Sequence, residues 1–103
     1  MIANTPKPPY YAVIFTSKTS DDLAGYQEMS QQMLSLAAEQ DGFLGIESAR
    51  EDIGITVSYW RDLDSIKQWK ANATHQIAQQ LGKTRWYESF TTRIARVESD
   101  YSA

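Results

Sequence analysis

The sequence predicts a single α+β domain of the ferredoxin-like plan, in which four strands form one antiparallel sheet and two helices cover one of its faces. Segments rich in aromatic and β-branched residues alternate with two segments whose apolar residues recur every three or four positions. Their order is β-α-β-β-α-β, and a short polar connection typical of a hairpin separates the two middle strands. The length of 103 residues suits one domain.

The first half of the domain is predicted as a strand followed by a helix. Residues 10–17 read YYAVIFTS, a composition that favours a strand. The helix that follows has Ser20 as its predicted N-cap and Gly42 as its end. Its apolar stripe consists of Leu23, Tyr26, Met29, Met33, Leu36 and Ala37.

The second half is predicted as a hairpin, a helix and a last strand. The hairpin strands span 43–50 and 54–61, and the last strand spans 88–98. Asp62 or Asp64 is expected to cap the helix between them, and Gly82 to end it. The apolar stripe of this helix consists of Ile66, Trp69, Ala73, Ile77 and Leu81.

Both faces of the predicted sheet carry apolar side chains. Along the first strand, Tyr11, Val13 and Phe15 alternate with Tyr10, Ala12 and Ile14, and the third strand places Ile55, Val57 and Tyr59 opposite Trp60. Two helices hide only one face, and an exposed aromatic patch of that size is unusual for a monomer. We therefore expect two chains to pair through the second face as a homodimeric, barrel-like assembly.

The composition excludes several function classes. The chain has no cysteine, so disulfides, thiolate catalysis, zinc ribbons and iron–sulfur clusters are excluded, and a cytoplasmic location is expected. A net charge of −3 with no basic stripe argues against nucleic acid and membrane surfaces as partners. One histidine and no carboxylate cluster with ligand spacing predict no metal site. Residues 1–9 are expected to form a flexible arm, with no signal peptide or membrane anchor, ahead of a domain at 10–103.

Several segments resemble the antibiotic biosynthesis monooxygenase (ABM) family. They are 42–48 (GFLGIES), 54–60 (GITVSYW), 66–70 (IKQWK) with His75, 86–88 (WYE) and 93–98 (RIARVE). The resemblance covers about residues 10–101. It implies a dimeric α/β barrel, in agreement with the argument from the two sheet faces.

The resemblance also implies an activity, that of a cofactor-independent monooxygenase that oxidises a small quinol- or phenol-like substrate in an apolar pocket. The alternative is a non-catalytic dimer that binds a small hydrophobic ligand or takes part in a stress response. Heme-degrading relatives match at Trp69 but use a histidine further along that helix and an asparagine on the first strand. Here Gln79 stands ten residues after Trp69 and the first strand has no asparagine, so no heme or other cofactor is expected.

His75 is the candidate catalytic base, because histidine is the side chain whose ordinary pKa lies near neutrality. On one unbroken helix it lies nearly opposite the apolar stripe, which favours a structural role. A break at Asn72 and Thr74 would change that phase.

Four aromatic residues are candidates for substrate binding. Trp69 is interpreted either as core packing or as the wall of a flat aromatic pocket. Tyr59 and Trp60 alternate faces, so one enters the helix-side core and the other the second face. Trp86 is interpreted as a pocket, core or dimer contact. Glu47 is interpreted either as a cross-strand ion-pair partner of Arg93, Arg96 or Arg50 or as a buried carboxylate that serves as a base.

Overall fold

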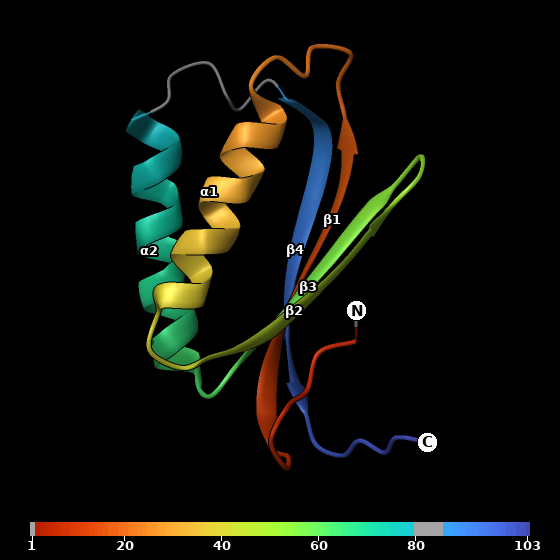
Figure 1. The fold of residues 1–103 in the computed structure, drawn as a ribbon, viewed down its shortest axis with the longest axis vertical. Helices are drawn as coiled ribbons and strands as arrows, with labels where there is room; N and C mark the ends of the chain where they lie inside the picture. Colours follow the sequence, from red (N-terminus) through yellow and green to blue (C-terminus); the bar gives the residue numbers. More distant parts are fainter. Residues whose placement is uncertain (1, 80–85) are drawn as a thin grey trace.

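The computed structural model describes residues 2–79 and 86–103, with the backbone alone at 75–79. The six elements are β1 (Tyr10–Thr19), α1 (Tyr26–Glu39), β2 (Phe43–Arg50), β3 (Gly54–Trp60), α2 (Leu63–Gln79) and β4 (Tyr87–Val97). All strand pairs are antiparallel, in the order β2-β3-β1-β4. Both helices stand on the same side of the sheet (Figure 1). The predicted fold class is therefore confirmed.

The core lies between the helices and one face of the sheet. Trp60 of β3, Ala37 of α1 and Ile66 of α2 form its buried centre. Four half-buried residues pack against it, namely Tyr11, Val13, Phe43 and Trp69. Since Tyr11 is paired with Trp60 across β1 and β3, the predicted alternation is confirmed for these two strands.

Helix α1 begins later than predicted. Its first residue is Tyr26, and Gly25 is the N-cap with a positive φ of 79°. The Ser20 hydroxyl instead accepts a hydrogen bond from the Asp22 N–H, and the Asp22 carboxylate accepts one from Ala24 N–H. These local bonds give the backbone an alternative to the helix, so the prediction of Ser20 as N-cap is wrong. Leu23 consequently lies outside α1 and is exposed.

Helix α2 is capped by Asp62, one of the two residues predicted as its N-cap. The Asp62 carboxylate accepts hydrogen bonds from the N–H of Ser65 at 2.8 Å and from its hydroxyl at 2.7 Å. Asp62 is thus the N-cap. The predicted end at Gly82 lies outside the described residues. Within the part of the chain that the structure describes, neither helix is long and apolar enough to cross a membrane.

Gly42 holds the start of β2 close against the first turn of α2. Its φ is +89°, and a Cβ placed there would lie 2.6 Å from Ser65 Cβ and would overlap Ser65 Oγ. We expect Gly42→Ala to lower the free energy of unfolding by about 1–3 kcal/mol from backbone strain alone. Displacement of Ser65 from its hydrogen bonds with Asp62 would add to that loss. Urea denaturation monitored by circular dichroism measures it.

A second variant separates the two causes of this loss. Asparagine tolerates positive φ better than alanine, yet it carries the same Cβ. If close packing against Ser65 dominates, Gly42→Asn is expected to be no more stable than Gly42→Ala. An alanine variant as stable as the wild type would contradict the role of Gly42.

The chain's own ends cover part of the second sheet face. The N–H of Ala3 donates to Glu47 at 2.9 Å, and the Thr5 hydroxyl donates to the Tyr10 hydroxyl at 3.0 Å. Tyr10 in turn donates to Asp100 in the segment after β4. Tyr10 and Ala12 are buried as a result. The apolar area left open on this face is therefore smaller than the sequence alternation implies.

Candidate functional site

Two tryptophan rings lie flat against each other on the helix side of the sheet. The Trp60 and Trp69 rings are stacked with centroids 5.8 Å apart and an interplanar angle of 22°. Trp60 is fully buried, and its indole N–H donates to the Ser58 hydroxyl at 2.9 Å. Trp69 is half-buried. The stack therefore offers a fixed inner ring and an outer ring with part of its surface accessible, an arrangement suited to a flat aromatic ligand.

A second aromatic cluster joins the start of α1, the start of β4 and the second half of β1. Tyr26 packs edge-on against both Trp86 and Tyr87, at centroid distances of 5.6 and 5.8 Å. Phe15 contacts Tyr87 at 5.3 Å and Phe90 at 5.5 Å. Trp86 is buried, and its indole N–H donates to Ala24 O at 2.8 Å. Phe90 is 61% exposed, so this cluster extends from the core to the surface.

Two phenol hydroxyls of this cluster lie close together. The Tyr87 hydroxyl donates to that of Tyr26 at 3.4 Å. Burial raises the pKa of Tyr87 above its ordinary value, and the hydrogen bond with Tyr26 raises it further. Tyr87 is consequently protonated at neutral pH and acts as a hydrogen-bond donor rather than as a base. In the sequence, Tyr26 belongs to the apolar stripe of the first helix and Tyr87 follows Trp86 in the segment 86–88, but their contact with each other could not be foreseen.

His75 lies in the last part of α2. The final turns of α2 and the first turn of α1 lie at the same end of the molecule as the start of β4 (Figure 1). The helix is continuous through Asn72 and Thr74, so the break that would change the phase of His75 does not occur. Its position is therefore roughly half a turn around the helix from Ile66. The side chain of His75 lies outside the described residues, and its role stays a prediction.

Tyr59 points to the opposite face of the sheet from Trp60, as predicted. Its hydroxyl donates to Glu47 at 2.7 Å, and its ring packs edge-on against Tyr10 with centroids 5.8 Å apart. Burial, and then the Glu47 carboxylate, raise the pKa of Tyr59 to about 12. Tyr59 is thus separated by the sheet from the stacked tryptophans, and the structure does not bring the two together.

The prediction that Glu47 pairs with an arginine is wrong. Its carboxylate accepts hydrogen bonds from Tyr59 and from the N–H of Ala3. Two of the three arginines contact other groups, since Arg50 donates to Ser17 and Arg96 lies beside Glu98. The Tyr59 hydroxyl on the adjacent strand satisfies the Glu47 carboxylate, so no cation is needed. A search for opposite charges across the strands does not detect a neutral donor of this kind.

The Glu47 contacts imply a pH-dependent stability. The hydrogen bond from Tyr59, and then that from Ala3, hold the pKa of Glu47 below its ordinary value of 4.5. A lowered pKa in the folded state means that the carboxylate stabilises the fold above pH 4.5 and that this contribution is lost as the pH falls through the folded pKa. We expect Glu47→Gln to lower the free energy of unfolding at pH 7 by about 1 kcal/mol.

Urea denaturation at pH 7 and pH 4 measures this difference, which is expected to shrink at the lower pH. Glu51→Gln, at the exposed hairpin connection, is the matched control and is expected to change stability little at either pH. Equal effects of the two variants at pH 7 would contradict the role of Glu47.

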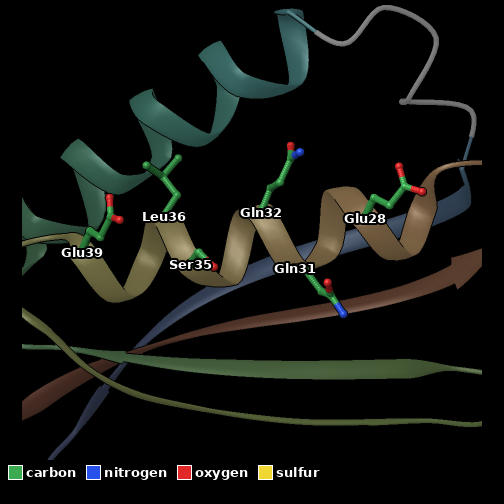
Figure 2. Close-up of a pocket in the computed structure, with 6 residues that line it drawn as sticks. All are labelled: Glu28, Gln31, Gln32, Ser35, Leu36 and Glu39. Carbon is green, nitrogen blue, oxygen red and sulfur yellow. The ribbon is translucent and has the colours of Figure 1, made fainter.

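An open groove of about 610 Å³ runs along α1. Polar side chains dominate its lining, which consists of Glu28, Gln31, Gln32, Ser35, Leu36 and Glu39. Figure 2 shows Gln31 pointing toward the sheet, whereas Gln32 and Leu36 point away from it. A smaller hollow lies on α2 at Asp64, Lys67, Gln68 and Ala71. None of the predicted site residues lines either hollow.

Arg50 reaches across the sheet on the side that carries the stacked tryptophans. Its guanidinium donates through Nη2 to the Ser17 hydroxyl at 2.5 Å and through Nη1 to Ser17 O at 3.5 Å. Ser17 is buried, at the far end of β1 from Tyr10. The sequence interpretation treated Arg50 only as a partner for Glu47. The short hairpin connection predicts that Arg50 is paired with Gly54. Glycine has no side chain and therefore leaves room for that of Arg50.

The family model described as antibiotic biosynthesis monooxygenase matches residues 9–81. The chain belongs to the antibiotic biosynthesis monooxygenase family. The match covers β1 through α2 and includes the stacked tryptophans, and the resemblance inferred from the sequence is confirmed.

Two relatives match most of this ABM chain. It is 50% identical over 99 residues to the uncharacterized protein YqjZ of Bacillus subtilis, covering 94% of this chain and 87% of that protein. It is 29% identical over 94 residues to the jasmonate monooxygenase ABM of Pyricularia oryzae, covering 84% of this chain. The aligned part spans only 43% of the fungal protein.

Solved structures agree with the ABM fold. A variant of SnoaB, a cofactor-independent oxygenase from Streptomyces nogalater, superposes with a TM-score of 0.72 at 13% identity, covering 88% of this chain and 95% of SnoaB. PA3566 from Pseudomonas aeruginosa has a TM-score of 0.68 at 11% identity, covering 93% and 99%. At these identities the likeness establishes the fold alone.

Proposed function

We propose that this ABM protein is a cofactor-independent monooxygenase that oxidises a small, flat phenol or quinol. The observation that carries the proposal is the stack of Trp60 and Trp69 on the helix side of the sheet, within the segment that matches the family. Trp60 is fully buried and Trp69 is half-buried, so part of the outer indole stays accessible beside the stack. An accessible indole surface favours a planar aromatic substrate through offset stacking.

The proposed reaction needs only the substrate and dioxygen. A phenol that has lost its proton is electron-rich enough to reduce dioxygen at a ring carbon. One oxygen atom forms a new carbonyl at that carbon, and the other leaves as water together with the two hydrogens lost from the phenol and the ring carbon. The substrate thus supplies all four electrons and becomes a quinone. The protein's task is to orient the ring and to accept the phenol proton.

Residues of this chain are assigned to those two tasks. Trp69 and Trp60 orient the ring, and the Tyr87 and Tyr26 hydroxyls offer hydrogen bonds at the second aromatic cluster. Trp86 holds Tyr26 in place from the core. His75 is the proposed proton acceptor, because it is the one histidine of the chain and lies on the same helix as Trp69.

We also propose a homodimer that pairs through the second sheet face. Ile55 is 47% exposed there, and Val57 and Ile14 are half-buried beside it. Burying these side chains against a second copy would contribute roughly 1.5–3 kcal/mol for each large apolar group that becomes fully covered. Tyr59 lies at the covered end of this face, so in the dimer it is a contact near the subunit boundary rather than a wall beside Trp69.

Oxygen consumption tests the proposed activity. Purified protein is mixed with a panel of phenols and quinols in air-saturated buffer, together with jasmonate because one relative is named for it. We expect one dioxygen consumed for each quinone formed, and label from ¹⁸O₂ in the new carbonyl. Trp69→Ala is expected to raise KM, whereas Lys67→Ala on the surface of α2 serves as the matched control.

A second outcome supports the non-catalytic alternative. If the same aromatic compounds bind by calorimetry but no dioxygen is consumed by any of them, the protein is a ligand-binding member of the family. The hydroxyls of Tyr26 and Tyr87 would then serve only to hold the ligand.

A further inference from the structure

Four residues form one row across the whole sheet at its hairpin end. Arg50 of β2 is paired with Gly54 of β3, Gly54 with Ser17 of β1, and Ser17 with Phe90 of β4. Paired residues of an antiparallel sheet project to the same face. This row therefore lies on the face that carries Trp60, the helix side.

Gly54 makes room for the arginine within this row. A Cβ at Gly54 would lie 2.6 Å from Arg50 Nε and would overlap the guanidinium carbon. The Arg50 side chain therefore lies flat across β3 and ends on β1, where the buried Ser17 holds it through two hydrogen bonds. The hairpin projects away from the helices, which leaves this part of the sheet open (Figure 1).

The guanidinium of Arg50 retains unused hydrogen-bonding capacity. An arginine has five N–H donors, and Ser17 takes two of them. Among the described residues, no carboxylate lies within ion-pair distance of Arg50, so its charge is not neutralised by the part of the chain that the structure describes. A planar guanidinium with free donors fits a carboxylate, which accepts two parallel hydrogen bonds from it.

Aromatic rings and hydroxyls stand in the same row of the sheet as this charge and in the next row. Phe90 stands next to Ser17 in the row, and Phe15 and Tyr87 pack against Phe90. The neighbouring row presents the hydroxyls of Ser48, which is exposed, and Thr56, which is half-buried, and the two oxygens lie 2.9 Å apart. The sheet surface thus combines one cation, several donors and a partly exposed aromatic wall, and this combination selects ligands that are both flat and anionic.

We infer that Arg50 binds the carboxylate of an aromatic acid whose ring lies against Phe90 and Phe15, at a site separate from the stack of Trp60 and Trp69. This anion site goes beyond the proposed function, because it lies at the opposite end of the β1–β3 pairing from Trp60 and takes an aromatic carboxylate whether or not that compound is oxidised. Ser17 is a positioning residue, since it fixes the guanidinium on the sheet. Gly54 acts in the same way by leaving the path across β3 open.

A matched pair of probes tests the inference without any turnover. Isothermal titration calorimetry compares 1-hydroxy-2-naphthoate with 1-naphthol, the same ring with and without a carboxylate, at pH 7 and low salt. We expect the full chain to bind the carboxylate at least tenfold more tightly. Equal affinities for the two probes, or no binding of either by the folded wild type, would overturn the inference.

Three variants locate the preference. Arg50→Gln is expected to abolish the preference for the carboxylate while the affinity for 1-naphthol changes less than twofold. Arg50→Lys keeps the charge but loses the planar fork, and an intermediate preference is expected. Lys67→Gln removes one positive charge from the surface of α2 and is expected to leave the preference unchanged.

These outcomes separate a binding role of Arg50 from a structural one. If the guanidinium only fastens the hairpin to β1, Arg50→Gln lowers the melting temperature but keeps the tenfold preference, and that result would overturn the inference. Selective binding through Arg50 in a protein that consumes no dioxygen would contradict the proposed monooxygenase activity and leave the anion site standing.

Discussion

Trp60→Ala is expected to lower the free energy of unfolding by about 3–5 kcal/mol, the usual cost of deleting a fully buried tryptophan side chain. The Trp60 ring has no exposed surface and contacts both Phe43 and Trp69, at centroid distances of 5.4 and 5.8 Å. Its removal would leave a cavity at the centre of the core and leave the Trp69 ring without support. Urea denaturation followed by circular dichroism measures the change.

Trp60→Phe is the control for this prediction. Phenylalanine keeps an aromatic ring in the core but loses the donor to Ser58, so its loss is expected to be clearly smaller than that of alanine. Because Trp60 also backs the proposed substrate wall, Trp60→Phe should weaken binding of a planar ligand more than it weakens the fold. An alanine variant destabilised by under about 1 kcal/mol would contradict the assignment of Trp60 as the central core residue.

His75→Ala is expected to reduce the rate of dioxygen consumption by about 10²- to 10⁴-fold, the usual contribution of a positioned general base. The variant should unfold at the same urea concentration as the wild type within error, since alanine is a good helix former and α2 is continuous at this position. Initial rates at saturating phenol, measured with an oxygen electrode, give the result.

A change of substrate distinguishes proton acceptance from a structural role. A phenol that is already ionised at the working pH does not need a base, so its oxidation should be nearly unaffected by His75→Ala. Gln76→Ala, at the next position of the same helix, is the control. Rates within twofold of the wild type for every phenol would remove His75 from the reaction, and the continuous helix that places it opposite Ile66 would then explain why.

The fold could be predicted because its signals are local. The alternation of Tyr11 and Ala12, and the short connection after Arg50, depend only on neighbours in the chain, and these gave the strands, the hairpin and the faces of Tyr59 and Trp60. The start of α1 was mispredicted because short side-chain bonds around Asp22 compete with the helix over a few residues, and an apolar stripe does not register that competition.

The candidate site was predicted only in part, because its geometry depends on long-range register. Trp69 could be singled out from the stripe of its helix, but its stacking on Trp60 depends on how α2 crosses β3. The position of Arg50 over Ser17 depends on the register of β2, β3 and β1 and on the absence of a side chain at Gly54. The contact of Ala3 with Glu47 joins residues 44 positions apart, and no periodicity in the sequence encodes it.

The two ends of the chain converge on a single phenol. Thr5 and Asp100 both bond to the Tyr10 hydroxyl, so anything fused near either terminus emerges beside the same corner of the sheet. A purification tag at the N-terminus or the C-terminus would therefore sit at the boundary proposed between subunits. The assembly state and the catalytic rates are therefore best measured on untagged protein. Tagged protein would test whether a group at this corner prevents dimerisation.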